Sequence, residues 1–347
     1  MSKDSNRRIG FFSDLHIGIH QNSEKWHDVT FEWATWFTNE LRQQEITKLI
    51  FGGDFFHYRD EINVKSLHFA NTLLDLFNDF EIIMIPGNHD AYYKDNSNVH
   101  SLSILNNRAN ITIFDKPIVL TLFDKKVGFC PWGTSLENIP KCDLLIGHFE
   151  IQNFNFNSFK ICDAGIESCD LLLKSELILS GHFHKRQRRK YSNGEIIYAG
   201  NPFEMDFNDV NDQKGFYILH FNKENIRYEF IKNNISPIHV KANLSQLESL
   251  KKIAKDKGWS KLAIKIIIDK DIKTNLLDKI IASISFEAPF SLTTDYLYKF
   301  NVGDVQLTNE LGDLNIKQCI IEYIESLDID NKEQIQTKVI HLYNKFI

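Results

Sequence analysis

The sequence predicts an α/β protein in which two stacked β-sheets are flanked by helices. Strand-like apolar runs alternate with amphipathic helical segments in the first part, and a strand-rich region follows. In addition, five apolar runs each break at a small residue and then present polar side chains. With 347 residues and 43% hydrophobic side chains, the chain is long enough for one large core and a smaller second domain.

The alternating part begins with a strand in RIGFFSDLH at residues 8–16. The next segment places Trp26, Trp33 and Phe37 at helical spacing, which predicts a helix with a core-facing aromatic side. The elements expected in this part are a helix over 24–44, a strand over 47–52, a helix over 62–78, a strand over 81–85 and a short helix near 97–108.

From residue 111 the pattern becomes that of strands. They are expected over 111–114, 117–123, 126–130, 143–147, 176–180, 186–191, 195–199, 214–221 and 226–232. The last two read as a hairpin that turns across Asn222 to Asn225. So many strands after an alternating half favour two sheets over one.

A domain boundary is expected near residues 233–243, where Asn, Ser and Pro interrupt the pattern. A small α+β domain should follow, and a tail with two apolar helical stripes should end the chain. The expected domains are residues 1–235, 236–302 and 303–347. The later elements are a helix over 244–257, a strand over 262–268, a helix over 275–284, a strand over 291–299, and tail helices over 314–327 and 335–346.

Seven side chains that make good metal ligands follow the apolar runs: Asp14, His16, Asp54, Asn88, His148, His182 and His184. Asp14 and His16 are two residues apart, so on an extended segment they point the same way. Asp54 follows two glycines, and its carboxylate has two oxygens that can bridge two cations. Any one of these residues alone is better explained as a core histidine or a turn aspartate. The complete set predicts a metal site on loops at one edge of a sheet.

Oxygen and imidazole ligands without thiolates suit Mn²⁺, Fe or Zn²⁺ and argue against a structural zinc site. Two such cations about 3.5–4 Å apart are a device for phosphoester hydrolysis. His89 is the natural proton donor for the leaving oxygen. Asp90 either orients His89 or only caps the segment that follows it, and His57 either assists His89 by contacting phosphate or tuning it, or is a loop histidine without a role.

These motifs carry a family resemblance. The series DLH (14–16), GGD (52–54), GNHD (87–90), GH (147–148) and GHFH (181–184) resembles the calcineurin-like metallophosphoesterases. GDFFH at 53–57 resembles the SbcD type of DNA-repair nuclease, whereas the protein phosphatases of the superfamily typically have Asp in place of His57. The stretches 147–156 and 198–219 are similar to a phage-encoded recombination nuclease subunit. The specific likeness covers about residues 8–232.

The resemblance implies a metallophosphoesterase fold, with 236–302 as a capping domain and 303–347 as a helical segment that binds a partner. It also implies two Mn²⁺ ions, with Mg²⁺ or another divalent ion as alternatives. One would be held by Asp14, His16, Asp54 and His184, and the other by Asp54, Asn88, His148 and His182. His89 would be the catalytic acid, assisted by His57.

The resemblance further implies homodimerisation through the helices at 62–78 and 97–108. The C-terminal helical pair would dock on the coiled coil of an SbcC-like ATPase. Two helices that pack only on each other would show the same apolar stripes, so both interpretations stay open.

Three functions compete. The first is a Mn²⁺-dependent DNA exonuclease/endonuclease subunit that acts on double-stranded ends and single strands in recombination or repair. The second is a small-substrate phosphoesterase, either a cyclic nucleotide phosphodiesterase or a phosphoprotein phosphatase. The third, a non-enzymatic scaffold, predicts eroded ligands, and none is eroded.

The basic run KRQRRK (185–190) follows the last histidine motif directly. It is either a phosphate-backbone contact or an edge strand blunted by charge. The net charge of −6 argues mildly against nucleic acid, but local charge can outweigh the total.

A cytoplasmic protein without a membrane partner is expected, associated with the nucleoid or, if viral, in the host cytoplasm. No apolar run approaches the ~18 residues of a membrane span, and the N-terminus lacks a signal-peptide pattern. The five cysteines are scattered and read as reduced thiols: Cys130, Cys142, Cys162, Cys169 and Cys319.

Overall fold

The computed structural model describes residues 7–156, 160–269, 272–297, 321, 324–325 and 332–346. The chain divides into two compact units, Met1–Leu297 and Tyr298–Ile347. The first unit contains three β-sheets, and two of them form the body that carries the predicted ligands.

The first sheet has the strand order β12-β11-β1-β2-β3-β4. Four of its strands run parallel: β1 (Arg8–Phe12), β2 (Lys48–Phe51), β3 (Glu81–Met84) and β4 (Ile111–Ile113). The antiparallel strands β11 (Gly215–Phe221) and β12 (Ile226–Lys232) extend it beyond β1. They form the expected hairpin, in which the Asn222 N–H donates to the Asn225 carbonyl over 2.9 Å.

The second sheet has the order β5-β6-β7-β8-β10-β9. Its central strands β6 (Lys125–Cys130), β7 (Leu144–His148), β8 (Leu177–Gly181) and β10 (Gly194–Tyr198) are parallel. At the two edges, β5 (Ile118–Leu122) pairs antiparallel with β6, and β9 (Gln187–Tyr191) pairs antiparallel with β10. In both sheets the central parallel strands are buried on two faces and therefore read as continuous apolar runs in the sequence.

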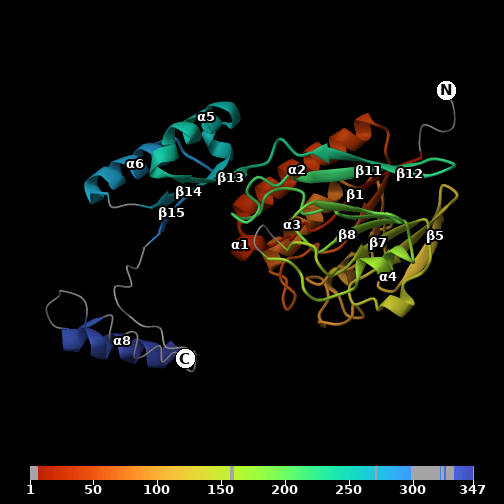
Figure 1. The fold of residues 1–347 in the computed structure, drawn as a ribbon, viewed down its shortest axis with the longest axis horizontal. Coiled ribbons are helices and arrows are strands. Elements are labelled where there is room, and N and C mark those ends of the chain that lie inside the picture. The colour runs from red at the N-terminus through yellow and green to blue at the C-terminus, as the bar shows by residue number, and fades with distance from the viewer. Residues whose placement is uncertain are drawn as a thin grey trace. The chain divides into compact units, whose positions relative to one another are not determined.

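The two sheets pack face to face. One buried cluster contains Phe11 and Ile50 of the first sheet together with Phe129 and Ile146 of the second. The helices α2 (Glu24–Gln43) and α3 (Val64–Asp75) cover the outer face of the first sheet, and the short α4 (Ser168–Leu172) lies on the second sheet (Figure 1). The predicted two-sheet sandwich flanked by helices is confirmed.

The aromatic stripe of α2 is part of the core. Trp33 and Phe37 are fully buried, and their rings stack with centroids 5.0 Å apart. Burying a side chain of this size stabilises the fold by roughly 1.5–3 kcal/mol. This burial explains why α2 (Glu24–Gln43) forms almost where the periodicity placed it.

The short helix expected near residues 97–108 forms only in part. Only a 3₁₀ helix over Ser101–Leu105 forms there. The segment is rich in Asn and Ser, whose side chains compete for backbone partners. Asn96 accepts a hydrogen bond from the Asn98 N–H at 3.2 Å, and the Ser97 hydroxyl donates to the Asp115 carbonyl at 3.1 Å.

The third sheet is parallel and has the order β13-β14-β15. Its strands are β13 (Ile238–Asn243), β14 (Leu262–Ile268) and β15 (Ser291–Tyr296), and its helices are α5 (Leu247–Lys257) and α6 (Thr274–Phe286). β13 was not expected, since its residues fall in the predicted boundary segment 233–243. Its apolar residues alternate at Ile238, Val240 and Ala242, a signal that the neighbouring Asn, Ser and Pro masked.

In the second unit, α8 (Lys332–Phe346) corresponds to the helix expected over 335–346. The helix expected over 314–327 lies outside the described residues, apart from positions 321 and 324–325. Across the described part of the chain, no helix has both the length and the apolar character that a membrane crossing requires. Four cysteines are free thiols, and Cys319 lies outside the described residues.

Candidate metal centre

The polar residues that follow the strands meet at the carboxyl edge of the two sheets. Asp14, Asp54 and Asn88 follow β1, β2 and β3 of the first sheet, and His148 ends β7 of the second. His182 and His184 follow β8. Ligands in sandwiches of parallel strands are expected at this edge because all the strands point their loops there. All seven predicted ligand residues come together in one region.

The backbone conformation at Asp14 and His16 differs from the one that the sequence predicts. The expectation of an extended segment is wrong, because Asp14 has φ 58° and His16 has φ 49°, both left-handed. Asp54 has φ 61° as well. Such residues cost of order 1–3 kcal/mol each and persist where the surroundings impose them. Here the Asp14 N–H donates to the Gly53 carbonyl at 2.9 Å and the His16 N–H to the Asp54 carbonyl at 3.0 Å.

Glycine is required where these loops touch. A Cβ on Gly53, which has φ +103°, would lie 2.5 Å from His148 Nδ1. A Cβ on Gly87 would lie 2.2 Å from Asp54 Oδ1. The glycines therefore give room to the protein's own ligand side chains rather than to a bound group.

The first set of ligand atoms centres on His16. Its Nε2 lies 2.8 Å from His184 Nε2 and 3.6 Å from Asp54 Oδ2. Asp14, His16 and His184 each offer a ligand atom within 4.8 Å of the others. Two imidazole nitrogens at this separation repel each other unless a proton or a cation lies between them.

The second set centres on the Asn88 side chain. Asn88 Oδ1 lies 3.0 Å from His148 Nε2 and 2.7 Å from His182 Nδ1. His148 Nε2 is also 3.4 Å from Asp54 Oδ2. The other ring nitrogen, His148 Nδ1, lies 2.7 Å from the Gly52 carbonyl and donates to it, so Nε2 is the nitrogen that faces the ligand set.

Asp54 belongs to both sets. Its Oδ2 faces His16 on one side and His148 on the other, at 3.6 and 3.4 Å. Its Oδ1 accepts a hydrogen bond from the His89 N–H at 2.8 Å, which fixes the orientation of the carboxylate. One oxygen is thus presented to two groups of ligands, as a bridging carboxylate requires.

Burial and mutual charge shift the pKa values of these groups strongly. Burial, assisted by His184, lowers the pKa of His16 well below its usual value. Burial, with His148 next to it, lowers the pKa of His182 to about 3. For His148, burial acts downward, but the Asp54 carboxylate outweighs it and raises the pKa to about 9. For Asp54, burial acts upward, but His148 and its other neighbours hold the pKa well below the usual range.

The donor set fits a pair of divalent cations. Carboxylate, amide and imidazole atoms converge, and His16 and His182 are held neutral, the form in which histidine binds metals. His182 Nε2 is buried and has no hydrogen-bond partner among the described residues. Convergent oxygen and nitrogen atoms of this kind are the ligands that a divalent cation takes in proteins.

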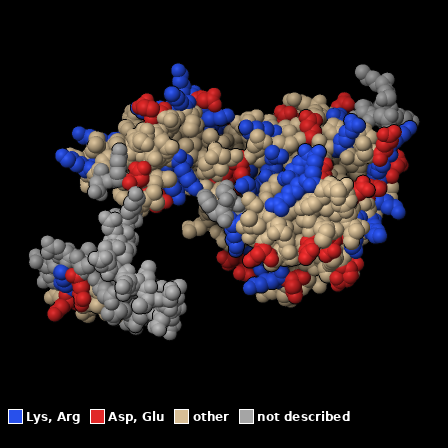
Figure 2. All heavy atoms as spheres, viewed as in Figure 1, with Lys and Arg blue, Asp and Glu red and all other residues tan. Residues whose placement is uncertain are grey.

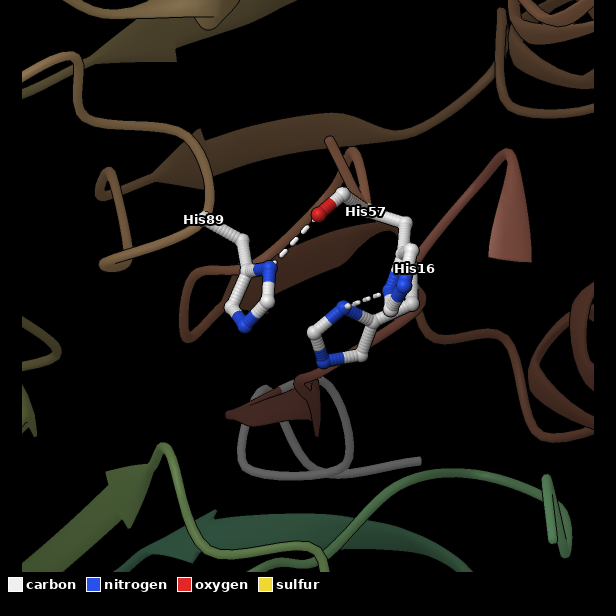
Figure 3. A group of neighbouring side chains, drawn as sticks. All are labelled: His16, His57 and His89. Atoms are coloured by element: carbon white, nitrogen blue, oxygen red, sulfur yellow. Dashed lines mark hydrogen bonds between the residues drawn. The ribbon is translucent and has the colours of Figure 1, made fainter. Parts of the chain in front are cut away.

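His89 and His57 lie beside the first ligand set (Figure 3). His89 Nδ1 is 2.6 Å from the His57 carbonyl, so this nitrogen carries the proton and Nε2 is left as the working atom. His57 Nδ1 lies 3.3 Å from His16 Nδ1. Burial and the neighbouring His89 lower the pKa of His57 to about 4, which keeps its ring neutral.

Asp90 ties the loops together. Its carboxylate accepts hydrogen bonds from the N–H groups of Asp54, Phe55, Phe56 and Gly87 at 2.8 to 3.2 Å. Burial and the nearby Asp54 raise the pKa of Asp90 to about 6. These hydrogen bonds tie the 54–56 loop to the turn that begins at Gly87, a role that the sequence did not suggest.

Two residues beside the site were missed in the sequence. Arg59 donates from Nε and Nη2 to the Asn88 carbonyl at 3.0 and 2.7 Å and so holds the main chain of a ligand. The Trp132 ring lies 5.0 Å from that of His182, and its Nε1 donates to the Lys94 carbonyl at 2.8 Å. Trp132 follows β6 in the way the ligands follow their strands, which was the available signal.

An open pocket of about 300 Å³ leads to the ligands. Its lining combines the site residues Asp54, Asn88, His89, His182 and His184 with Phe156, Phe183, Lys185, Asp206, Asn208, Asp209 and Asp212. A larger concavity of about 740 Å³ lies at β13 and does not include the ligands. The ligand atoms can therefore be reached from solvent through this pocket.

The basic run 185–190 is divided between two roles. The Arg186 guanidinium lies over the Phe230 ring at 4.1 Å, and Arg188 lies over Tyr228 at 5.3 Å, which closes the edge between the two sheets. Arg189 Nη2 donates to the Asn153 carbonyl at 2.6 Å. Lys185 lines the pocket, where its charge acts on the Asp212 carboxylate.

Residues 7–186 match the family described as calcineurin-like phosphoesterase, which is just over half of the chain. Exonuclease subunit 1 of Enterobacteria phage T4 is 28% identical over 232 residues, which cover 64% of this chain and 66% of that protein. The match thus spans just under two thirds of the length of this relative.

Solved structures of low identity are also similar. An archaeal phosphodiesterase is 15% identical with a TM-score of 0.35, covering 65% of this chain and 99% of the other. A dimetal phosphatase from Danio rerio is 11% identical with a TM-score of 0.44, covering 65% and 96%.

Proposed function

We propose that this chain, which belongs to the calcineurin-like phosphoesterase family, is a metal-dependent nuclease subunit that hydrolyses phosphodiester bonds in DNA. One observation carries the proposal: Asp54 Oδ2 faces two sets of ligand atoms, and a histidine with a free nitrogen lies beside them. This is the arrangement that a two-cation phosphoesterase needs.

The residues would hold two divalent cations, for which we propose Mn²⁺, with Mg²⁺ as an alternative. Asp14, His16, Asp54 and His184 would hold one, and Asp54, Asn88, His148 and His182 the other. When bound, the cations supply Lewis-acid stabilisation of the charge on phosphorus and help to activate the attacking water.

His89 is proposed as the acid that protonates the leaving oxygen. Its Nδ1 proton is committed to the His57 carbonyl, so the transferable proton resides on Nε2. His57 contributes through that carbonyl and through its ring next to His16, which makes it a positioning residue. Asp90 contributes by holding the Asp54 and Gly87 loops.

Three features support DNA as the substrate. A relative over 64% of the chain is named an exonuclease subunit. GDFFH, with His57, is the form that resembles DNA-repair nucleases. Despite a net charge of −6, some Lys and Arg side chains form a compact group on one face of the sandwich (Figure 2), and Lys185 lines the pocket.

The name of that relative also supports a partner subunit. We propose that this chain works with an SbcC-like coiled-coil ATPase, bound through the C-terminal segment 303–347, and that residues 236–302 form the capping domain. For the homodimer, α3 and the segment 97–108 remain the proposed contact, although the latter holds a 3₁₀ helix instead of the expected one.

The test compares substrates. Purified protein with Mn²⁺ is incubated with linear double-stranded DNA, with single-stranded DNA and with bis(p-nitrophenyl) phosphate, and Asp54→Asn serves as the matched inactive control. We expect cleavage of DNA and slower turnover of the chromogenic diester. Turnover of the chromogenic diester alone would replace the nuclease by a small-substrate phosphoesterase.

A further inference from the structure

A buried lysine lies beneath the candidate metal centre. Only 4% of Lys214 is exposed, and its ammonium sits among oxygens. It donates to the His184 carbonyl at 2.7 Å, to Asp209 Oδ1 at 2.7 Å, to Asn201 Oδ1, and to Asp212 Oδ2 at 3.5 Å. It belongs to the stretch 198–219, to which the proposed mechanism assigns no role.

Stability does not explain this lysine. Removing an ammonium from water costs several kcal/mol, and a buried ion pair often contributes little net stability compared with apolar residues of similar size. The pair is nevertheless well formed. Burial acts to raise the pKa of Asp209, but the Lys214 charge outweighs it and lowers that pKa. Because burying the Lys214 ammonium costs free energy, we infer that its role is to hold the groups it contacts in place.

The partner that matters is the main chain of His184. Besides Lys214, the Asn201 N–H donates to the same carbonyl at 3.3 Å. Gly200 packs against it so closely that a Cβ there would lie 2.7 Å from the oxygen. Three neighbours therefore fix the backbone from which the His184 imidazole reaches His16.

We propose that Lys214 is a positioning residue for His184 and, through it, for the ligand set that includes Asp14 and His16. The proposal rests on the proposed metal centre. The set of Asn88, His148 and His182 is held by other contacts, such as that of His148 Nδ1 with the Gly52 carbonyl. Loss of Lys214 therefore weakens one cation site and spares the other.

The experiment measures Mn²⁺ binding by isothermal titration calorimetry, with electron paramagnetic resonance to distinguish a coupled pair from single ions. The wild-type protein is measured first and should bind two equivalents. In Lys214→Met we expect one equivalent to bind about 10–100-fold more weakly, as for lost outer partners of metal ligands, and the other within about threefold. The coupled signal should give way to that of a single ion.

A second variant separates positioning from folding. Lys214→Met leaves the buried Asp209 carboxylate without its cation and lowers the melting temperature, whereas Lys214→Met/Asp209→Asn removes both charges and should recover most of it. We expect the weak Mn²⁺ equivalent to stay weak in the double variant. If Mn²⁺ affinity recovers together with the melting temperature, or if both equivalents weaken alike, the positioning role is wrong. A wild-type protein that binds fewer than two equivalents overturns the proposed centre itself.

Discussion

The sandwich and the three-stranded sheet of residues 238–296 are both built from parallel strands and apolar cores, yet they treat the polar residues at their strand ends differently. In the sandwich, Asp54 and His148 are buried and face atoms of other loops. In the small sheet, β13 ends at Asn243, whose side chain accepts from the Ser245 N–H at 3.1 Å and joins Gln246 in a capping box. A polar strand end becomes a site only where several loops bring complementary atoms together.

Positive φ angles at non-glycine residues, a sign of backbone strain, are also more frequent in the sandwich than in the small sheet. Four proposed ligands have positive φ: Asp14, His16, Asp54 and His182. Among the described residues after 237, Ala288 with φ 51° is the one non-glycine residue of this kind. Strain of this sort persists where the surrounding structure imposes it, and it is often part of a functional site. At the four ligand positions the loops therefore hold a strained backbone that presents the side chains to the site.

The largest effect should come from the residue that both ligand sets share. We expect Asp54→Asn to reduce turnover by more than the roughly 10²–10⁴-fold that loss of a single proton donor costs, because one change disturbs both cations. Steady-state hydrolysis and Mn²⁺ titration of the same preparation measure it. If the variant binds both equivalents of Mn²⁺ and keeps most of its activity, Asp54 does not serve both cation sites, and the proposed difference between the sandwich and the small sheet is wrong.

His89→Ala should rank next, with DNA cleavage lowered by about 10²–10⁴-fold and Mn²⁺ uptake retained. The reason is that His89 supplies a proton and is not among the proposed ligands. The control is the leaving group. p-Nitrophenolate leaves without a proton, so bis(p-nitrophenyl) phosphate should lose far less turnover than DNA. Equal losses on the two substrates would mean that His89 does not act as the acid.

Mn²⁺ affinity should increase with pH. In the metal-free protein the pKa of His148 is about 9, raised by Asp54 against the effect of burial, so the ring is protonated at neutral pH. A cation must displace that proton, so the apparent affinity should rise up to about tenfold per pH unit between pH 6.5 and 9. Calorimetry in two buffers of different ionisation enthalpy should detect the released proton at pH 7. A Mn²⁺ affinity that does not change with pH would show that His148 carries no proton for the cation to displace.

The same His148 shift affects the stability of the metal-free protein. The unfolded imidazole titrates near 6.5 and the folded one near 9. Its contribution is therefore complete below pH 6.5 and is lost as the pH rises toward 9. Excess Mn²⁺ should reduce this loss, because the cation takes the place of the proton.

The smallest effect on catalysis should come from the core of the small sheet. Ile264 is fully buried in β14, and Ile264→Ala should destabilise this region by about 2–5 kcal/mol while turnover of the chromogenic diester stays unchanged. Hydrogen exchange of the β14 amides measures the first and steady-state kinetics the second. The matched control is Leu276→Ala on α6, which is 51% exposed and should change stability by less than about 0.5 kcal/mol. Lost chromogenic turnover in Ile264→Ala would show that the two regions are not independent.

Local sequence patterns were enough to predict the fold class, most of the elements and the identity of the ligand-type residues. Apolar runs, helical periodicity and a polar residue directly after a strand are local properties, and the topology of parallel strands brings their ends to one edge. The same local reading failed at 97–108 and at β13, where Asn and Ser decided or obscured the structure.

The geometry within the site depends on contacts between distant parts of the chain. These contacts hold the backbone of Asp14 and His16 in the left-handed region. They also direct the Asp90 carboxylate to backbone amides and place the Arg186 guanidinium over the Phe230 ring. Contacts of this kind also bring the Lys214 ammonium to the His184 carbonyl. Each of these outcomes depends on contacts between residues about 30 to 44 positions apart in the chain, and no local pattern in the sequence records such contacts.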